Sequence, residues 1–404
     1  MGEIALDGSI RPIRGALPIA IQALKDNFKG FILPKENAEE AAIVKGIDVY
    51  AVTHLKEVID FLEGKIRLVP SVMDARALFK NQQQQPLLDF SDVKGQETIK
   101  RCMEIAAAGG HNVILIGPPG AGKTMLAKRL PSILPPLTLG EALETTKIHS
   151  VLGRVKERGL VHYRPFRSPH HIISDVALVG GGTYPQPGEI SLAHNGVLFL
   201  DELPEFKRSV LEVMRQPLED REVTISRAKF TVTYPSSFML VASMNPSPSG
   251  YFHTGATTPI ETQRYLSKIS GPLLDRIDLH IEVAPVPFEE LSDKEMGESS
   301  VAIRKRVTAA RALQQNRFKN FNSVHYNAQM SPKLLRDFCQ LDLNALNLLK
   351  TAMKKLGLSA RAYDRILKVA RTIADLAGAE NITSAHIAEA IQYRSLDREG
   401  WMKS

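Results

Sequence analysis

Over residues 17–62, the spacing of apolar residues alternates between that of short strands and that of helices. Short apolar runs at Ile32–Leu33 and Val49–Ala51 predict strands, and segments with helical spacing lie around them. These helical segments are Leu17–Leu24, Asn37–Val44 and Leu55–Leu62. Asn81, four glutamines and Pro86 then interrupt the pattern, so we expect a linker there rather than a buried element.

From Phe90 onward the spacing is that of an α/β fold. Val113–Ile116, Val197–Leu200 and Met239–Ala242 are entirely apolar, as are strands that are covered on both faces of a parallel sheet. Beyond Pro287 the pattern turns helical, and the last helix is preceded by a capping segment at 381–383. The expected helices are Val301–Phe318, Leu356–Gly378 and Ala385–Tyr393. The fold class predicted is α/β, with a central parallel sheet flanked by helices and a helical C-terminal region.

The segment between the first of these strands and the following helix fits G-x-x-x-x-G-K-[ST], the pattern of a phosphate-binding loop. Its residues are Gly117, Pro118, Pro119, Gly120, Ala121, Gly122, Lys123 and Thr124. Glycines let backbone N–H groups turn toward phosphates, and the following helix presents its positive N-terminal end. We therefore expect ATP here, with Lys123 neutralising the β- and γ-phosphates and Thr124 binding Mg²⁺.

Two acids and an asparagine follow the next two apolar strands. Asp201 and Glu202 come directly after Val197–Leu200, at the end where parallel sheets bind their ligands. We expect Asp201 to hold Mg²⁺ through water, and Glu202 to orient the attacking water. Asn245 ends the following strand, and its amide can contact both the γ-phosphate and that water. ATP and Mg²⁺ are therefore the predicted cofactors of an ATPase.

Composition and charge narrow the class of protein. Of the 404 residues, 44% are apolar and 24% are charged, which is the balance of a folded globular protein. The net charge of +7 favours a polyanionic partner such as nucleic acid, although many cytosolic enzymes are mildly basic. Cys102 and Cys339 lie far apart, and no apolar run reaches the length of a membrane span. The simplest interpretation is a cytoplasmic protein with no membrane partner.

Taken together, the motifs resemble those of the magnesium-chelatase-like AAA+ ATPases of the ComM/YifB type, along nearly the whole chain. Phe90–Gln96 looks like the family's motif beside the adenine. Further blocks that carry the resemblance are Arg164–His171, Gly180–Gly182, Pro187–His194, Gly271–Arg276, Leu358–Ala362 and Val369–Leu376. The resemblance implies a ring, usually a homo-hexamer, with ATP bound between subunits.

The resemblance assigns roles to arginines from two of these blocks. Arg276 matches the arginine finger that reaches the γ-phosphate of a neighbouring subunit; the alternative is a salt bridge with Asp275 or Asp278. Arg361 matches the sensor-2 arginine of the helical lid, which contacts phosphate in the same subunit. Arg365 competes with Arg361 for that assignment.

A hairpin before the asparagine strand supplies the candidate DNA contacts. The family's relatives include the minichromosome-maintenance helicases, whose hairpin at this point carries a lysine into the central pore. Val223–Thr233 looks like that hairpin, and alternating apolar residues fit two paired strands. Lys229 and Arg227 would then contact a phosphate backbone; the alternative is a solvated pair of charges. Arg164–His171 and Gly180–Gly182 resemble the helix-2 insert that faces the same pore.

No zinc site is expected. Many family members carry cysteines after the sensor asparagine, whereas this chain has serines at 247 and 249 and no cysteine between Cys102 and Cys339. Serine hydroxyls are poor substitutes for thiolates as zinc ligands. His170 and His171 are adjacent but lack a matching cysteine or acid cluster, so they do not indicate zinc either.

The N-terminal segment resembles the C-terminal half of a Lon-protease-like domain, on Gly2–Leu6, Gly8–Ile13 and Leu33–Asn37. The dyad serine would lie upstream of Met1, so an N-terminal portion is expected to be missing, and the dyad lysine position falls near Leu17. Without an ionisable base, peptide cleavage has no chemistry, and the segment is interpreted as a structural element or a site for a protein partner. The expected division is 1–66 Lon-like, 67–89 linker, 90–290 ATPase core with insert and hairpin, and 291–404 helical lid.

Two functions remain open at this point. The first is a hexameric DNA motor, a helicase or branch-migration ATPase of recombination or natural transformation. The second is a protein-remodelling ATPase of the magnesium-chelatase type, in which the same nucleotide residues would act. A nucleotide-switched scaffold without turnover is disfavoured, because Glu202 and Arg276 together indicate hydrolysis.

Overall fold

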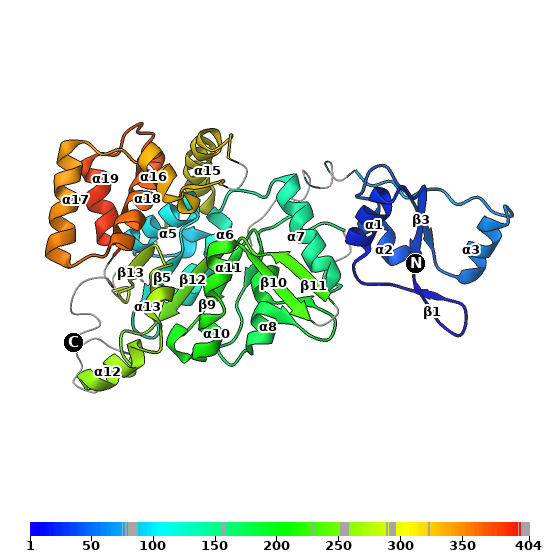
Figure 1. Cartoon of the computed structure of the whole chain (residues 1–404), viewed down its shortest axis with the longest axis horizontal. Helices are drawn as coiled ribbons and strands as arrows, with labels where there is room; N and C mark the ends of the chain where they lie inside the picture. The colour runs from blue at the N-terminus through cyan, green and yellow to red at the C-terminus, as the bar shows by residue number, and fades with distance from the viewer. Residues whose placement is uncertain are drawn as a thin grey trace.

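The computed structural model describes residues 1–74, 76, 79, 88–155, 159–227, 230–250, 258–287, 290, 296–321, 324–394 and 396. The molecule is elongated, with the N-terminal segment at one end, a sheet-based core in the middle and a helical region at the other end (Figure 1). None of the helices in these ranges is long and apolar enough to cross a membrane.

The N-terminal segment alternates strands and helices as predicted. Its elements are β1 (Glu3–Ile4), β2 (Ile10–Arg11), α1 (Ala16–Lys25), β3 (Gly30–Pro34), α2 (Lys35–Ala41), β4 (Asp48–Val52) and α3 (Leu55–Leu62). β3 and β4 pair in parallel, and β1 pairs with β2 antiparallel. The predicted strands at Ile32–Leu33 and Val49–Ala51 are confirmed, because both runs lie within β3 and β4. Around this small sheet α1 and α2 bury their alanine-rich faces.

A buried carboxylate joins this segment to the core. Glu40 on α2 accepts a hydrogen bond from the backbone N–H of Leu17 at 2.9 Å and another from the hydroxyl of Ser150. Ser150 lies on α7 (Leu139–Val151), and its carbonyl also accepts from the N–H of Gly15 at 2.9 Å. Leu17 of α1, Ala142 of α7 and three residues outside these helices form an apolar cluster across the same joint. The segment is therefore packed directly on α7, as Figure 1 shows.

A five-stranded parallel sheet forms the centre of the core, in the order β13-β5-β12-β9-β6. Its strands are β5 (Val113–Ile116), β6 (Phe166–Arg167), β9 (Val197–Leu200), β12 (Met239–Met244) and β13 (Leu279–Glu282). The three strands predicted from apolar runs are confirmed as the three central ones, β5, β12 and β9. In register, Val113 pairs with Val241 and with Leu279, so all carboxyl ends meet at one edge of the sheet.

Helices cover both faces of the sheet. On one face, buried side chains of α5 (Glu97–Gly109), α6 (Lys123–Ile133), α15 (Ser300–Arg317) and α18 (Ala360–Leu376) form a single core with β5 and β9. The other face is covered by shorter elements. These are α8 (Asp175–Val179), α9 (Glu189–Leu192), η2 (Leu203–Glu205), α10 (Arg208–Glu212), α11 (Arg215–Asp220), α12 (Pro259–Leu266) and α13 (Gly271–Leu274).

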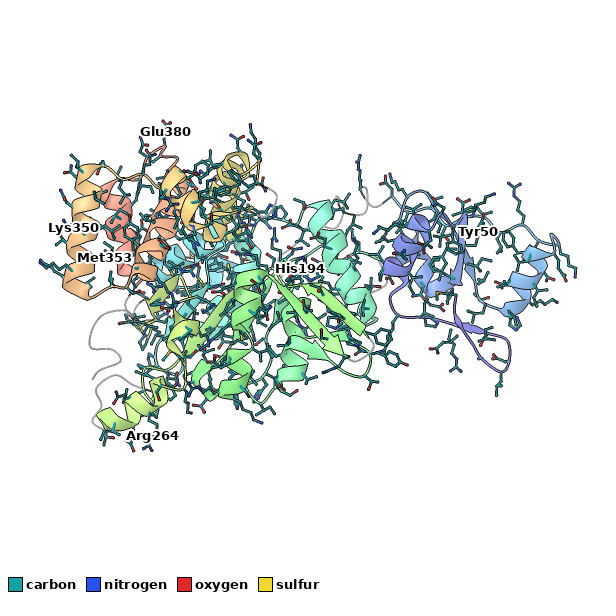
Figure 2. The ribbon with its side chains drawn as sticks, viewed as in Figure 1. Tyr50, His194, Arg264, Lys350, Met353 and Glu380 are labelled. Atoms are coloured by element: carbon teal, nitrogen blue, oxygen red, sulfur yellow. The ribbon has the colours of Figure 1, made fainter. Side chains whose placement is uncertain are left out.

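The C-terminal region is helical, as predicted. Its remaining elements are η3 (Asn327–Gln329), α16 (Pro332–Phe338), α17 (Leu343–Leu356) and α19 (Ser384–Gln392). The predicted helix Leu356–Gly378 is wrong at its start, because Gly357 adopts a left-handed conformation (φ 64°) and ends α17 at Leu356. α17 lies on the outside, where Figure 2 shows Lys350 and Met353. The region shares its apolar core with the sheet, because Ile366 and Ile373 of α18 pack within it.

The predicted hairpin is present beside the core as β10 (Glu222–Arg227) and β11 (Phe230–Pro235), which pair antiparallel. Next to it, β7 (Gly180–Gly181) and β8 (Gln186–Pro187) form a second, shorter hairpin from the expected insert. Lys229, a candidate DNA contact, lies outside the described residues.

Candidate active site

Three polar segments meet at the carboxyl edge of the sheet, because each one follows a parallel strand. The phosphate-binding loop follows β5, Asp201 follows β9, and Asn245 follows β12. The loop turns through Gly120 and Gly122, whose φ angles of 79° and 86° lie in the left-handed region that glycine adopts without strain. Gly122 caps the N-terminus of α6, whose first residue is Lys123. A helix N-terminus therefore faces the space where phosphates are expected.

Lys123 is buried among the oxygens of this edge. Its Nζ donates to the carbonyl oxygens of Gly117 at 2.6 Å and Pro118 at 2.9 Å, and to Asn245 Oδ1 at 3.1 Å. Burial lowers the pKa of Lys123, while the charge of Asp201 acts in the opposite direction. The structure thus brings together the lysine and the asparagine that the sequence assigned to the γ-phosphate.

Asp201 connects the loop to the neighbouring strand. Thr124 Oγ1 donates to Asp201 Oδ2 at 2.8 Å, and the hydroxyl of Ser243 donates to the other carboxylate oxygen. A hydroxyl and a carboxylate are the hard oxygen ligands that Mg²⁺ prefers, so these residues fit the predicted ion. Ser243 was missed by the sequence analysis, although a serine within an otherwise apolar strand, two residues before Asn245, was a usable signal.

Glu202 is held in an unusual backbone conformation. Its φ of 55° and ψ of 52° are left-handed, which costs a residue with a side chain about 1–3 kcal/mol. The N–H of Glu202 donates to Ser243 Oγ at 3.2 Å, so the strand that ends in Asn245 also fixes the turn. His171 Nδ1 lies 3.7 Å from Glu202 Oε2 and its ring packs edge-on against Phe206. The sequence placed His171 only in the insert, and its contact with Glu202 depends on how the loop after β6 folds.

The family motif before α5 supports the loop from behind. Gln96 Nε2 donates to the carbonyl oxygens of Ala121 in the loop and Ala284 after β13, both at 3.1 Å. Phe90, in η1 (Phe90–Asp92), is fully buried in the core. Another motif residue, His194, has a structural role, since its Nδ1 accepts from the N–H of Ser237 at 3.0 Å (Figure 2).

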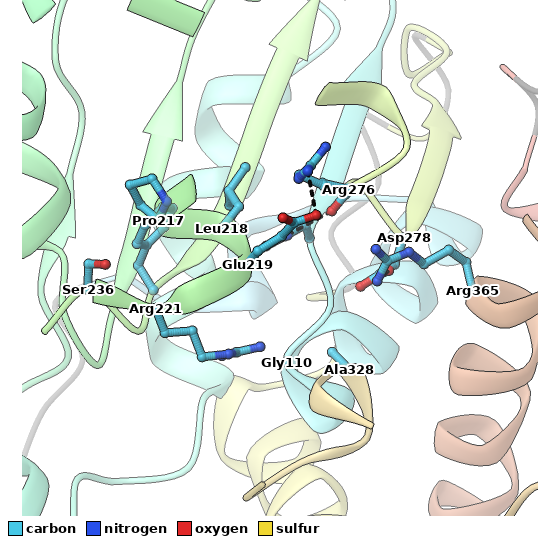
Figure 3. Close-up of a pocket in the computed structure, with 12 residues that line it drawn as sticks. Gly110, Pro217, Leu218, Glu219, Arg221, Ser236, Arg276, Asp278, Ala328 and Arg365 are labelled. Carbon is cyan, nitrogen blue, oxygen red and sulfur yellow. Dashed lines mark hydrogen bonds and ion pairs between the residues drawn. The ribbon is translucent and has the colours of Figure 1, made fainter. Parts of the chain in front are cut away.

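The arginines assigned to phosphate lie at the opposite edge of the sheet. Asn112, directly before β5, accepts from the N–H of Asp278 at 3.0 Å and donates from its side chain to the carbonyl of Arg276 at 2.9 Å. Arg276 is therefore fixed at the amino ends of β5 and β13. A four-residue strand separates this edge from the phosphate-binding loop by about 13 Å. Arg276 ion-pairs with Glu219, and not with Asp275 or Asp278 (Figure 3).

Arg361, which the resemblance assigns to phosphate in the same subunit, lies instead at the amino edge of the sheet. Arg361 lies in the first turn of α18 and ion-pairs with Asp275, the residue before Arg276. Its competitor Arg365 ion-pairs with Asp278 at 3.1 Å. α18 packs along the face of the sheet with its first turn at the amino edge, so neither arginine is near Lys123. Figure 3 shows Arg365 and Arg276 around one pocket.

Asp278 anchors this edge to the helical region. It is 2% exposed and lies 3.1 Å from His111 Nδ1, whose Nε2 contacts Thr372 of α18 at 2.8 Å. Burial alone would raise the pKa of Asp278, but Arg365 and His111 outweigh burial and hold it well below its usual range. The carboxylate is therefore ionised where it meets Arg365.

Of the candidate DNA contacts, only Arg227 is described. It ends β10, and its Nε donates to the carbonyl of Gly182 at 3.3 Å. The two hairpins are thus joined at their tips. Among the residues that the structure describes, no group of three or more His, Cys, Asp or Glu could hold a metal ion.

A phosphate-binding loop, an acidic pair and a polar sensor on adjacent parallel strands, followed by a helical region, define an ATPase of the AAA+ type. Models of protein families agree. Magnesium chelatase, subunit ChlI, matches residues 89–291; its C-terminal model matches 297–394; and subunit ChlI of Mg-chelatase matches 1–37.

Similar proteins extend along the whole chain. Identity is 47% to the uncharacterized protein YifB of Escherichia coli (strain K12), over 98% of this chain and 77% of that protein. It is 45% to the competence protein ComM of Haemophilus influenzae, over 98% and 78%. A chloroplastic magnesium-chelatase subunit ChlI of Glycine max is 22% identical, over 80% and 77%. The chain belongs to the magnesium-chelatase-like AAA+ ATPase family of the ComM/YifB type, which uses nucleotide and Mg²⁺.

Proposed function

We propose that this protein is an ATP-driven DNA motor that acts as a ring of identical subunits, a hexamer in keeping with its family, with ATP hydrolysed between neighbours. The observation that carries the proposal is the separation of the two sets of polar residues. Lys123, Thr124 and Asp201 lie at one edge of the sheet, and Arg276 lies at the other. Arginines that cannot reach their own nucleotide can reach that of the next copy in a head-to-tail ring.

Hydrolysis would use the residues of the carboxyl edge. Lys123 neutralises the β- and γ-phosphates, Thr124 and Asp201 hold Mg²⁺, and the ion offsets negative charge on the phosphates. Glu202 orients a water for attack on the γ-phosphorus and accepts its proton, while the bond between that phosphorus and the bridging oxygen breaks. Asn245, which is hydrogen-bonded to Lys123 at the end of β12, would contact the γ-phosphate and so couple its presence to the position of β12.

Arg361 belongs with Arg276 in this proposal. Its side chain is 70% exposed, so it can leave Asp275 for a phosphate on a neighbouring copy. A charged group brought to the reacting phosphate from another subunit stabilises charge that develops in the transition state. We accordingly replace the same-subunit role of Arg361 with a role between subunits.

DNA is the polymer along which we propose that the motor moves. The net charge of +7, Arg227 at the hairpin tip and the family relation to a competence protein support it. Branch migration during recombination or natural transformation is the corresponding activity.

We also propose a division of the chain into a Lon-like segment (1–66), a linker (67–89), an ATPase core (90–290) and a helical lid (291–404). In this proposal the Lon-like segment is a site for a protein partner.

Mixing two inactive variants tests whether the site is shared. Lys123→Ala lacks the phosphate-binding lysine, and Arg276→Ala lacks the arginine, so each alone should hydrolyse almost no ATP. Mixed in equal amounts, the two should recover about a quarter of the wild-type rate, because that share of interfaces pairs an intact loop with an intact arginine. A mixture as inactive as its components would contradict an active site between subunits.

DNA dependence is tested by the steady-state ATPase rate with single-stranded, double-stranded and four-way-junction DNA at two salt concentrations. Salt-sensitive stimulation is expected, because each neutralised phosphate releases counterions. The alternative is a protein-remodelling ATPase of the magnesium-chelatase type, which the matching family models support. Stimulation by a partner protein, with indifference to every DNA, would favour that alternative.

A further inference from the structure

Two exposed aromatic side chains stand together at the tips of the hairpins. Tyr184, in the turn between β7 and β8, is 74% exposed, and Phe230, the first residue of β11, is 47% exposed. Their ring centroids are 6.4 Å apart and the rings are tilted by 39°. Single exposed apolar side chains are normal on protein surfaces, whereas two aromatic rings in contact beside an arginine form a patch suited to a ligand. Neither the proposed hydrolysis nor the packing of the core uses this pair.

The turn between β7 and β8 is held in place by contacts from β10 and β11. Arg227 Nε donates to Gly182 O at 3.3 Å, and Tyr234 Oη donates to Pro185 O at 2.9 Å, so β10 and β11 grip the turn on both sides of Tyr184. The turn also lies very close to β10. A Cβ atom on Gly181 of β7 would lie 2.9 Å from Val176 Cγ1 and 3.0 Å from Arg227 Nη2, so a larger residue there would displace side chains of both neighbours. The tyrosine and the phenylalanine are therefore presented as one unit.

The chemistry of this unit fits an unpaired nucleobase. Flat π faces stack on bases of any sequence, and a guanidinium beside them can meet the phosphate backbone. The two rings form an aromatic pair at an ordinary contact separation of 6.4 Å, and both remain largely exposed, so a base can stack on the pair from outside. Bases in a duplex are already stacked and paired, so this unit selects single strands.

We propose that Tyr184 and Phe230 form a stacking site for the unpaired bases of single-stranded DNA, with Arg227 contacting the adjacent phosphate. The inference rests on the proposed DNA motor and names the form of DNA that the motor grips. A motor that stacks on bases holds a separated strand more firmly than contacts with phosphate alone allow.

The test compares a single-stranded oligonucleotide with an abasic strand of the same length, which has the phosphates but no bases. Binding of the full chain is measured by fluorescence anisotropy. Tyr184→Ala and Phe230→Ala should each weaken binding of the normal strand by about tenfold. Neither variant should change binding of the abasic strand or the salt dependence, because no phosphate contact is lost. Tyr184→Phe and Phe230→Tyr retain the ring and should bind like the wild type.

Arg227→Ala is the contrasting variant. It should weaken binding of both strands and reduce the slope of log affinity against log salt by about one unit. The far-UV circular dichroism spectrum and the thermal unfolding midpoint of Tyr184→Ala and Phe230→Ala should match those of the wild type, which shows that these variants fold. Wild-type affinity of both alanine variants for the normal strand, or an equal loss on the abasic strand, would overturn the stacking site.

Failure of the stacking site and failure of the motor give different results. If the motor is right and the stacking site wrong, the wild type binds single strands and the alanine variants bind equally well. If the wild type binds no DNA, both the stacking site and the DNA motor are wrong. ATPase stimulation by an unfolded polypeptide, lost in Tyr184→Ala, would assign the aromatic pair to a protein substrate and overturn the inference.

Discussion

The two edges of the central sheet hold their polar side chains in different ways. At the carboxyl edge, Lys123 donates to backbone oxygens of its own loop and to Asn245, and Thr124 donates to Asp201. At the amino edge, Arg276 and Arg361 are each paired with a carboxylate from another element. The first arrangement is pre-formed for a nucleotide of the same copy. In the proposed ring, a phosphate of the neighbouring copy would replace Glu219 or Asp275, which would link catalysis to assembly.

The largest expected effect is at the amino edge. Arg276→Ala should lower the turnover number of the assembled protein by about 10³–10⁵, the range for an arginine that stabilises charge in phosphoryl transfer. ATP binding to each copy should be nearly unchanged, because Arg276 is far from Lys123. A coupled-enzyme ATPase assay and a fluorescent-nucleotide titration measure the two quantities. Arg264→Ala, on α12 at the periphery (Figure 2), is the control and should retain full activity.

The carboxyl edge should show the next largest effect. Glu202→Gln should lower turnover by about 10²–10⁴ while ATP remains bound, because the amide cannot accept the proton of the attacking water. Single-turnover hydrolysis and equilibrium nucleotide binding separate the two. Glu205→Gln, three residues on, removes an acid that pairs with Lys268 at 3.5 Å and should have little effect. Unchanged turnover in Glu202→Gln would mean that another group orients the water.

Arg361→Ala tests whether this arginine acts on the nucleotide of its own copy or on that of a neighbouring copy. We expect turnover of the assembled protein to fall on the order of 10²-fold, as when one donor to developing charge is removed. Nucleotide affinity measured under dilution, where copies are separated, should not change. A loss of affinity in separated copies would return Arg361 to the nucleotide of its own subunit.

The contact between the amino edge of the sheet and the helical region should contribute less stability at low pH. Asp278 has a pKa below its usual range, so its contribution to stability is complete above about pH 4 and is lost as the pH falls through the lowered value. Asp278→Asn should destabilise the protein by about 2 kcal/mol at neutral pH, because Arg365 and His111 lose an ionised partner. Its unfolding free energy should also fall less steeply in acid. Chemical denaturation from pH 7 to 3 measures both, and parallel curves for variant and wild type would contradict the assignment.

The smallest effect is expected at His171. Its contact with the partly exposed Glu202 is 3.7 Å long, and such pairs contribute little. His171→Ala should lower kcat about two- to fivefold with KM for ATP unchanged, since only the orientation of Glu202 is loosened. A change in KM alone would show that His171 acts on nucleotide binding. His170→Ala, on the neighbouring ring, is the matched control.

The sequence predicted the carboxyl edge because each of its segments is local. A run of apolar residues followed directly by a polar motif reveals both the strand and the group at its end, as at Leu200 and Asp201. The edge strands were not predicted. β6 is only two residues long, and β13 includes His280 and a glutamate in place of a continuous apolar run.

The amino edge was not predictable for a different reason. The spacing of apolar residues in α18 shows which of its faces is buried, but not which end of the sheet its first turn meets. That depends on long-range contacts such as Arg365 with Asp278, and on the left-handed Gly357 that separates α17 from α18. The contact between His171 and Glu202 is likewise formed by two loops that are distant in sequence.

Glu40 has a consequence for how the molecule unfolds. Its carboxylate is buried between α2 and α7, and its hydrogen-bond donors, Leu17 and Ser150, come from both sides of the joint. Separation of the two parts would break the hydrogen bond between Ser150 and Glu40 and expose the apolar cluster beside it. The N-terminal segment and the core are therefore one cooperative unit, and heating should melt them in a single transition.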